Sequence, residues 1–355
     1  MFGVKLKKKY KFVFWYPYGL GDIVMLCPLI YEIKNSNIPL EDHLFIFKDN
    51  ASIKLAHEYF PELECFVFKR KIFSRNFLDF LFLASSCKKI IAPMLSRKFQ
   101  NYLSLLIFFK ETYVPNNFFS ESFLWLRNLS TNLISFKGHQ SMYLMYIYSK
   151  VNKNFIYKDS SSYKVKPLNL RNVSKNNEKN IVAIGLSCGP HERHKLPSAR
   201  YFAKFINLMH EYIDLEVFLF GISSDGDLMS NFRENLLPNI NCRELIDLDF
   251  SDLFNHISIC NFGIAGTTGQ GHMFASTGIK MITFSGVTDF EKNGPLSENQ
   301  IPLSHDFKCG PCYSDDYQYG CKNIACMDYI PLEDSVKKTL NFLKEEKDEL
   351  RVKLI

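Results

Sequence analysis

Two patterns alternate along the first quarter of the chain: short apolar runs, and longer segments in which apolar residues recur every three or four positions. The apolar runs predict strands at 12–16, 43–47, 64–68 and 89–92. The amphipathic spacing predicts helices at 23–33, 52–60 and 72–85. Strands that alternate with helices in this way predict a parallel sheet with helices on its faces.

The same alternation returns after residue 180. The pattern predicts strands at 181–186, 216–220, 260–264 and 280–285. It predicts helices at 198–212, 225–236, 250–258, 269–276 and 331–347. We therefore expect two doubly wound α/β domains, with ligands at the carboxyl ends of the strands and in the cleft.

The stretch between these two regions has a different character. Residues 99–148 are aromatic and helical in pattern, and 118–125 fit either a packed helical insertion or an exposed acceptor-binding surface. Residues 159–180 are rich in Ser, Asn and Lys and predict a linker. The expected division is a domain at 1–158, this linker, a second domain at 181–330 and a C-terminal helix at 331–355.

Composition favours a folded protein with two domains. A length of 355 residues fits two domains of about 150 residues each. The 46% hydrophobic content argues against disorder. The net charge of +6 suits an anionic ligand or a membrane surface but requires neither.

The N-terminus and the apolar runs indicate where in the cell the protein is expected. The runs are too short to span a membrane and no signal-peptide pattern is present, so we expect a cytoplasmic protein. The lysines at 5–11 fit a solvated tail or a peripheral contact with acidic lipid headgroups of the inner membrane. The lysines do not interleave with aromatics as in a nucleic-acid module, and we expect no nucleic-acid partner.

The first predicted strand is followed by Gly19-Leu20-Gly21-Asp22, which leads into a helix. The two glycines allow a tight turn, but Val24 stands where a dinucleotide fingerprint has its third glycine. Asp22 fits a structural acid in the first turn of the helix. It also fits a general base at the floor of a cleft.

A glycine-rich turn at 264–272 follows another predicted strand and opens a helix. Glycines that bare backbone N–H groups at a helix start predict a phosphate or diphosphate cradle. His272 could donate to a phosphate or a sugar. The alternative is an ordinary strand-to-helix turn with a structural histidine.

Basic residues gather at 188–198, after the first strand of the second region. Arg193, His194 and Lys195 precede Ser198, a predicted helix N-cap. Such a cluster suits a diphosphate, and a solvated basic loop is the alternative.

Four of the ten cysteines lie in one polar segment: Cys309, Cys312, Cys321 and Cys326. Their spacing is C-x2-C-x8-C-x4-C, and four thiolates could hold a structural zinc or iron ion. A second C-x2-C pair is missing, so reduced thiols are the alternative.

The ordered set of motifs resembles glycosyltransferase family 9, the ADP-heptose:lipopolysaccharide heptosyltransferases. The resemblance rests on these segments, which occur in both halves and in the order of the family: Gly19-Leu20-Gly21-Asp22, Lys195-Leu196-Pro197, Thr268-Gly269-x-x-His272, residues 284–289 with Gly294-Pro295, and the cysteine segment 309–327. It implies a GT-B fold, in which two Rossmann-like domains face each other across a cleft. The domain at 1–158 would be the acceptor side, and the domain at 181–330 would bind the nucleotide-sugar donor.

The resemblance also implies roles for single residues in an inverting sugar transfer. Asp22 is similar to the acid that deprotonates the acceptor hydroxyl, with Gly19 and Gly21 in the acceptor-side turn. The implied donor-binding residues are Lys195, Arg193, Asp225, Thr267, Thr268, Gly269 and His272. Lys195 would neutralise the donor diphosphate, so catalysis would need no cofactor.

One position departs from the family. Where the family usually has Asp-Thr-Gly, this chain has Thr267-Thr268-Gly269. The change puts the heptose in doubt more than the transfer itself. We expect an enzyme that moves a heptose or related sugar from an ADP-activated donor to a glycan or glycolipid acceptor, such as a lipopolysaccharide or lipooligosaccharide core. The alternatives are another nucleotide sugar, a protein acceptor, or a non-catalytic nucleotide-sugar-binding protein.

Overall fold

The structure of the chain, a computed structural model, describes residues 10–67, 87–93, 111–115, 131–157, 180–189, 192–306, 310–312 and 324–344. The chain divides into two compact units, Met1–Tyr163 and Lys164–Ile355. The division falls within 159–180, the expected linker, nearly all of which lies outside the described residues. Each unit has its own sheet and its own core.

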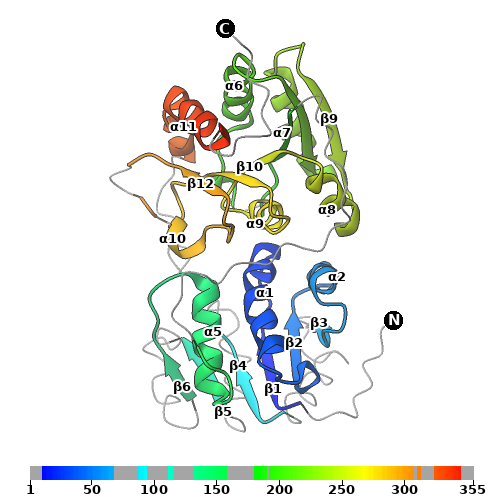
Figure 1. Ribbon diagram of the computed structural model, residues 1–355, viewed down its shortest axis with the longest axis vertical. Helices are drawn as coiled ribbons and strands as arrows, with labels where there is room; N and C mark the ends of the chain where they lie inside the picture. The colour runs from blue at the N-terminus through cyan, green and yellow to red at the C-terminus, as the bar shows by residue number, and fades with distance from the viewer. Residues whose placement is uncertain are drawn as a thin grey trace. The chain divides into compact units, whose positions relative to one another are not determined.

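A six-stranded parallel sheet forms the centre of the first unit (Figure 1), in the order β3-β2-β1-β4-β5-β6. Its strands are β1 (Phe12–Trp15), β2 (His43–Phe47), β3 (Cys65–Val67), β4 (Lys89–Ile91), β5 (Glu111–Pro115) and β6 (Thr131–Ile134). The chain reverses its direction across the sheet between β1 and β4. Open α/β sheets bind ligands at such a switch point, beyond the carboxyl ends of the strands.

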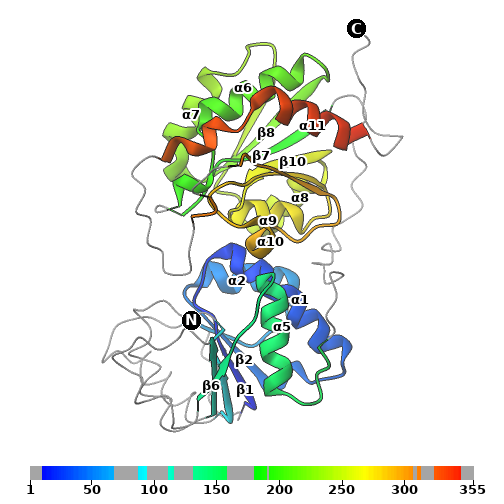
Figure 2. The same cartoon turned by 90° about the vertical axis from the view of Figure 1, so that its left-hand side faces the viewer.

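The described helices of this unit are α1 (Leu20–Asn35), α2 (Asn50–Tyr59) and α5 (Gln140–Val151). They lie in a row on one face of the sheet, with α1 in the middle and in contact with both others (Figures 1 and 2). Strands β1 and β2 are buried at every position. A parallel strand buried on both faces reads as a continuous apolar run, which explains the signal that predicted them.

The second unit repeats this plan with the strand order β12-β11-β10-β7-β8-β9, again all parallel. Its strands are β7 (Asn180–Gly185), β8 (Leu215–Gly221), β9 (Asn241–Ile246), β10 (Phe262–Gly266), β11 (Lys280–Phe284) and β12 (Gln300–Leu303). When the strands are numbered within each unit, both sheets have the order 3-2-1-4-5-6 of a Rossmann fold. Strands β7 and β10 therefore flank the switch point of the second sheet.

Helices cover both faces of the second sheet (Figure 2). One face carries α6 (Ala199–His210), α7 (Gly226–Glu234) and α11 (Leu332–Lys344), and the other carries α8 (Phe250–Ser258) and α9 (Gly269–Ala275). A short helix, α10 (Phe290–Asn293), follows β11. On α6, Phe202 and Phe205 meet Phe284 edge to face, with ring centroids 5.2 and 5.4 Å apart. This aromatic cluster anchors α6 to the sheet, since such pairs stabilise beyond the area they bury.

The helical character predicted for 99–148 is wrong at two places. Strands β5 and β6 occupy part of that stretch, and α5 is the helix that the structure describes there. Both strands complete the parallel sheet, so tertiary pairing decides their conformation. Residues 118–125 lie outside the described residues. The sequence pattern also missed β9, β12 and α10.

Of the helices that the structure describes, none combines the length and the hydrophobicity that a membrane crossing requires.

His43 is a polar side chain in the core of the first unit. The residue is fully buried, with Nδ1 3.0 Å from the carbonyl oxygen of Pro39 and Nε2 2.7 Å from the hydroxyl of Tyr148. A neutral imidazole satisfies both contacts, because Nδ1–H donates to the carbonyl while Nε2 accepts from the hydroxyl. Burial lowers the pKa of His43 to about 4.

Acidification should therefore destabilise the first unit through His43. Its folded-state pKa lies below the ordinary value of 6.5, so its contribution is complete above pH 6.5 and lost as the pH falls to about 4. The full loss is about 3 kcal/mol. The measurement is the free energy of unfolding against pH for the wild type, His43→Gln and, as a control, His57→Gln. We expect a shallower pH dependence for His43→Gln alone; equal slopes in all three proteins would contradict this assignment.

Candidate active site

At the switch point of the first sheet, β1 is joined to α1 by the turn that contains Gly19. Asp22 is the third residue of α1 and is partly exposed. Its Oδ2 accepts the backbone N–H of Gly19 at 2.8 Å, which caps the helix. The structural interpretation of Asp22 is thus correct. Its other carboxylate oxygen, Oδ1, lies 3.5 Å from the side-chain nitrogen of Gln140 on α5.

Tyr16 holds this turn through a hydrogen bond to its backbone. The residue is fully buried, and its hydroxyl donates to the backbone carbonyl of Asp22 at 3.1 Å. Burial, together with the charge of Asp22, raises the pKa of Tyr16 well above its ordinary value, so the phenol stays protonated. Tyr16 and Gln140 were missed in the sequence. No local signal connects Gln140 to Asp22, which lies 118 positions earlier.

In the second unit, Asp225 and Arg193 form an ion pair at the carboxyl ends of β7 and β8. Arg193 donates to Oδ1 of Asp225 at 3.0 Å, and the Asp225 side chain is 4% exposed. The Ser187 hydroxyl and the Ile222 backbone N–H donate to its Oδ2. Both oxygens of Asp225 are thus occupied within the protein. Asp225, expected to bind the donor, holds Arg193 and the loop after β7.

Lys195 lies in the same loop, in the short 3-10 turn Arg193–Lys195. Its side chain is 10% exposed, and Nζ lies 2.5 Å from a carboxylate oxygen of Glu192. Between the two cations, burial and the charge of Lys195 lower the pKa of His194, which favours its neutral form. The loop therefore carries two cations: Arg193 pairs with the buried Asp225, and Lys195 pairs with the partly exposed Glu192.

Two glycines bring β10, α9 and the β7 loop into close contact. A Cβ atom on Gly266 would lie 2.6 Å from the backbone oxygen of Lys195, and one on Gly271 would lie 2.3 Å from the backbone oxygen of Gly266. The Thr268 hydroxyl caps α9 by accepting from the Gly271 N–H at 3.5 Å. The glycine-rich turn thus has a packing reason besides the phosphate cradle expected from its sequence.

Gln270, the second residue of α9, connects three strand ends and was missed in the sequence. Its side-chain oxygen accepts the N–H of Ser187 at 2.8 Å, and its nitrogen donates to the carbonyl of Phe220 at 3.3 Å. It therefore joins the α9 turn to the ends of β7 and β8.

The remaining predicted donor residues lie at the same edge of the sheet. Thr267 is buried, and its hydroxyl hydrogen-bonds that of Thr288, which follows β11. His272 is buried in α9, and Gly269 begins that helix. The structure thus brings the predicted residues of the second unit together, and places Gly19, Gly21 and Asp22 at the matching edge of the first sheet.

The cysteine segment is described only in part. Cys312 is half-buried and packs against the core of the second unit. Cys309, Cys321 and the side chain of Cys326 lie outside the described residues. Within the described part of the chain, His, Cys, Asp and Glu form no group of three or more that could hold a metal. The metal site therefore stays a prediction.

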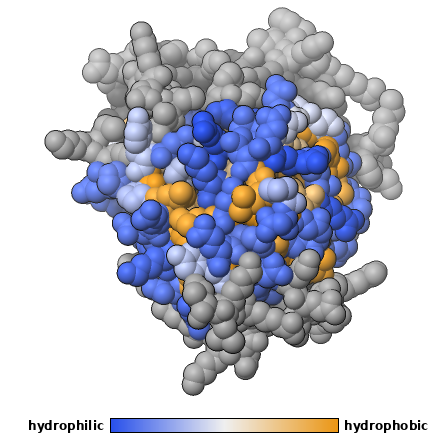
Figure 3. Space-filling model, turned by 90° about the horizontal axis from the view of Figure 1, so that it is seen from above, coloured by the Kyte–Doolittle hydropathy of each residue, from blue (hydrophilic) through white to orange (hydrophobic). Residues whose placement is uncertain are grey.

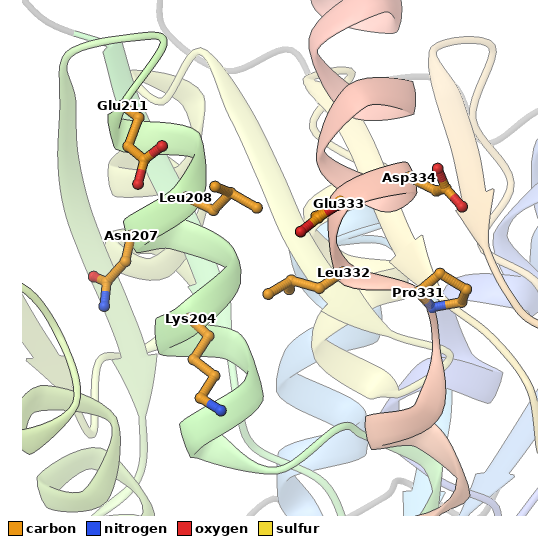
Figure 4. Close-up of a pocket in the computed structure, with 8 residues that line it drawn as sticks. All are labelled: Lys204, Asn207, Leu208, Glu211, Pro331, Leu332, Glu333 and Asp334. Atoms are coloured by element: carbon orange, nitrogen blue, oxygen red, sulfur yellow. The ribbon is translucent and has the colours of Figure 1, made fainter.

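A surface depression of 540 Å³ lies between α6 and α11 (Figure 4). It is lined by Lys204, Asn207, Leu208, Glu211, Pro331, Leu332, Glu333 and Asp334. None of these residues belongs to the sites above. The face drawn in Figure 3 carries small apolar areas separated by hydrophilic side chains. We therefore place the candidate active site at the strand ends and not in this depression.

Neither a protein-family model nor a curated protein sequence matches the chain. Solved structures do match it. The glycosyltransferase family 9 protein of Veillonella parvula has a TM-score of 0.66 at 15% identity, over 96% of this chain and 99% of its own. The ADP-heptose lipopolysaccharide heptosyltransferase II of E. coli has a TM-score of 0.63 at 13% identity, over 94% and 98%. The iron-containing dodecameric glycosyltransferase TibC of enterotoxigenic E. coli has a TM-score of 0.54 at 13% identity, over 95% and 76%.

These similarities establish the class of fold. The chain has the GT-B fold, built from two α/β units that each contain a parallel sheet. This confirms the predicted fold class. The resemblance to family 9 proteins seen in the sequence motifs extends to the architecture of nearly the whole chain. Because one fold hosts many activities, function has to be argued from the site residues.

Gly271→Ala should disturb the candidate site through the backbone. The added Cβ would meet the Gly266 oxygen at 2.3 Å, whereas a Cβ on Gly226, at the start of α7, would meet nothing within 4 Å. We expect Gly271→Ala to lower the free energy of unfolding by about 1–3 kcal/mol and Gly226→Ala to leave it unchanged or raise it. Thermal or denaturant unfolding of both variants tests this. Equal stability of the two variants would show that α9 is not held at this distance.

Proposed function

We propose that this protein is a glycosyltransferase of the family 9 type, which transfers a sugar from a nucleotide-activated donor to an acceptor hydroxyl. The observation that carries the proposal is the position of charge in the two sheets. The first sheet has a carboxylate, Asp22, at its switch point, and the second has the cations Arg193 and Lys195 at its own. Ligands of open α/β sheets bind at these positions.

Each charged group fits one requirement of an inverting transfer. The acceptor oxygen forms a bond to the anomeric carbon as the bond from that carbon to the diphosphate breaks. Asp22 takes the proton of the acceptor hydroxyl as general base. Lys195 and Arg193 stabilise the negative charge that develops on the departing diphosphate. The configuration at the other carbons of the sugar is unchanged, because none of their bonds breaks.

We propose an ADP-activated heptose or a related sugar as the donor and a cell-surface glycan on a lipid carrier as the acceptor. The support is the likeness in fold to the ADP-heptose heptosyltransferase II, together with the motif order. Thr267 argues for testing other nucleotide sugars as well, since a threonine replaces the acid that the family usually has. Thermal shift with ADP-heptose, other nucleotide sugars and ADP, followed by product mass, separates these donors. Stabilisation by a nucleotide sugar without turnover would favour the non-catalytic alternative.

Asp22→Asn tests the general base without removing the helix cap. The amide oxygen can still accept the Gly19 N–H, which Asp22→Ala would lose at a cost of about 1 kcal/mol. We expect Asp22→Asn to fold normally, bind the donor with unchanged affinity and lose about 10²–10⁴ in turnover. Glu32→Gln, at the other end of α1, is the matched control and should keep full turnover. Normal turnover of Asp22→Asn would remove Asp22 as the base.

We also propose that Cys309, Cys312, Cys321 and Cys326 hold one structural zinc or iron ion. Their spacing and the likeness in fold to the iron-containing TibC support this. Elemental analysis of the purified protein should find about one metal ion per chain. Cys312→Ser should lower the metal content. The control is Cys242→Ser, which removes a half-buried thiol on β9 and should leave the metal content unchanged. A wild-type protein without zinc or iron would refute the site.

A further inference from the structure

The two cations of the β7 loop are paired with carboxylates of very different accessibility. Asp225, the partner of Arg193, is 4% exposed and accepts from three separate donors. Glu192, the partner of Lys195, is 33% exposed, whereas the Lys195 side chain is 10% exposed. Moving Asp225 would break all three of these hydrogen bonds, which is costly. Moving Glu192 would return its carboxylate to water.

The chain next to Glu192 leaves room for this side chain. A Cβ atom on Gly189 would lie 2.9 Å from a carboxylate oxygen of Glu192, so the Glu192 side chain lies against the bare backbone of Gly189. The pair is also local, because the two residues are three positions apart in the chain. Rotation of one side chain is therefore enough to break it.

A buried ammonium needs a nearby negative charge. Glu192 supplies it in the ligand-free protein. A phosphate group that reaches Lys195 supplies the same compensation with more negative charge and more acceptor oxygens. The carboxylate and the phosphate therefore compete for one cation.

We propose that Glu192 is a competing counter-ion that tunes the phosphate affinity of this site: it holds Lys195 in place of a ligand phosphate and is displaced by one. A ligand gains from Lys195 only if its own charge outcompetes the carboxylate. Glu192 therefore lowers the affinity for ligands that carry a diphosphate and leaves the binding of uncharged sugars and nucleosides unchanged. This inference rests on the proposed function, in which Lys195 binds the donor diphosphate.

The test is the binding of pyrophosphate and of ADP, measured by calorimetry, to the wild type, Glu192→Gln and Glu192→Ala. Removing the competing charge should tighten the binding of both ligands about threefold to tenfold in either variant. Adenosine carries no phosphate and should bind both variants as it binds the wild type. The matched control is Glu211→Gln, which makes the same change in net charge. Glu211 follows the C-terminal end of α6, a helix about 18 Å long, whereas the Glu192 loop precedes its N-terminal end. It should bind pyrophosphate and ADP as the wild type does.

The outcomes separate this inference from the proposed function. If the wild type binds ADP and neither Glu192 variant binds it more tightly, Glu192 is not a competitor and the inference is overturned alone. Equal tightening by Glu211→Gln would mean a general effect of net charge and would also overturn it. If only the Glu192 variants bind ADP, the inference is supported strongly. If the wild type and all variants fail to bind pyrophosphate and ADP, the donor site of the proposed function falls, and the inference falls with it.

Discussion

The geometry of the second unit depends on how closely three backbone segments approach one another at the carboxyl edge of its sheet. The end of β10, the start of α9 and the loop after β7 meet at Gly266 and Gly271, with no room for a side chain at either position. Thr268 fixes the start of α9, and Gln270 joins that helix to the ends of β7 and β8. The backbone oxygen of Lys195 lies against Gly266, and the residue is buried. Backbone packing thus fixes the point from which this cation extends, and Glu192 pairs with its ammonium group.

A buried charge adds a second constraint to the same edge. Asp225 is removed from water, and a buried carboxylate is tolerated only when its oxygens are fully paired. The partners come from the β7 loop, through Ser187 and Arg193, and from the residue after β8, Ile222. Arg193 is therefore held in one place by the electrostatic need of Asp225. In the proposed function, the acid acts on a ligand indirectly, by fixing the direction of the arginine.

Much of the fold could be predicted from the sequence, because buried parallel strands such as His43–Phe47 read as continuous apolar runs. The strands at Glu111–Pro115 and Thr131–Ile134 were missed, since they are short and stand in an aromatic context that resembles a helix. The strand Asn241–Ile246 was missed because this edge strand is largely polar and partly exposed. For the site, the motifs indicated Asp22 and Lys195. Their partners differ in how far the sequence can predict them. Glu192 is three positions from Lys195, whereas Gln140 is brought to Asp22 only by the tertiary fold.

The fold fixes where charge lies, but the neutral residues around it decide which ligand fits. Thr267 and Thr288 share one hydrogen bond between their hydroxyls, and Ser285 donates to the backbone oxygen of Thr288. Two hydroxyls that share a single bond keep one O–H and several lone pairs, so the pair can still donate and accept. It cannot supply the full charge that a carboxylate would bring to a sugar hydroxyl, and charged hydrogen bonds are about twice as strong as neutral ones. In the proposed function, selection of a sugar at this position therefore rests on the geometry of the two hydroxyls, which β10 and the turn after β11 hold in place.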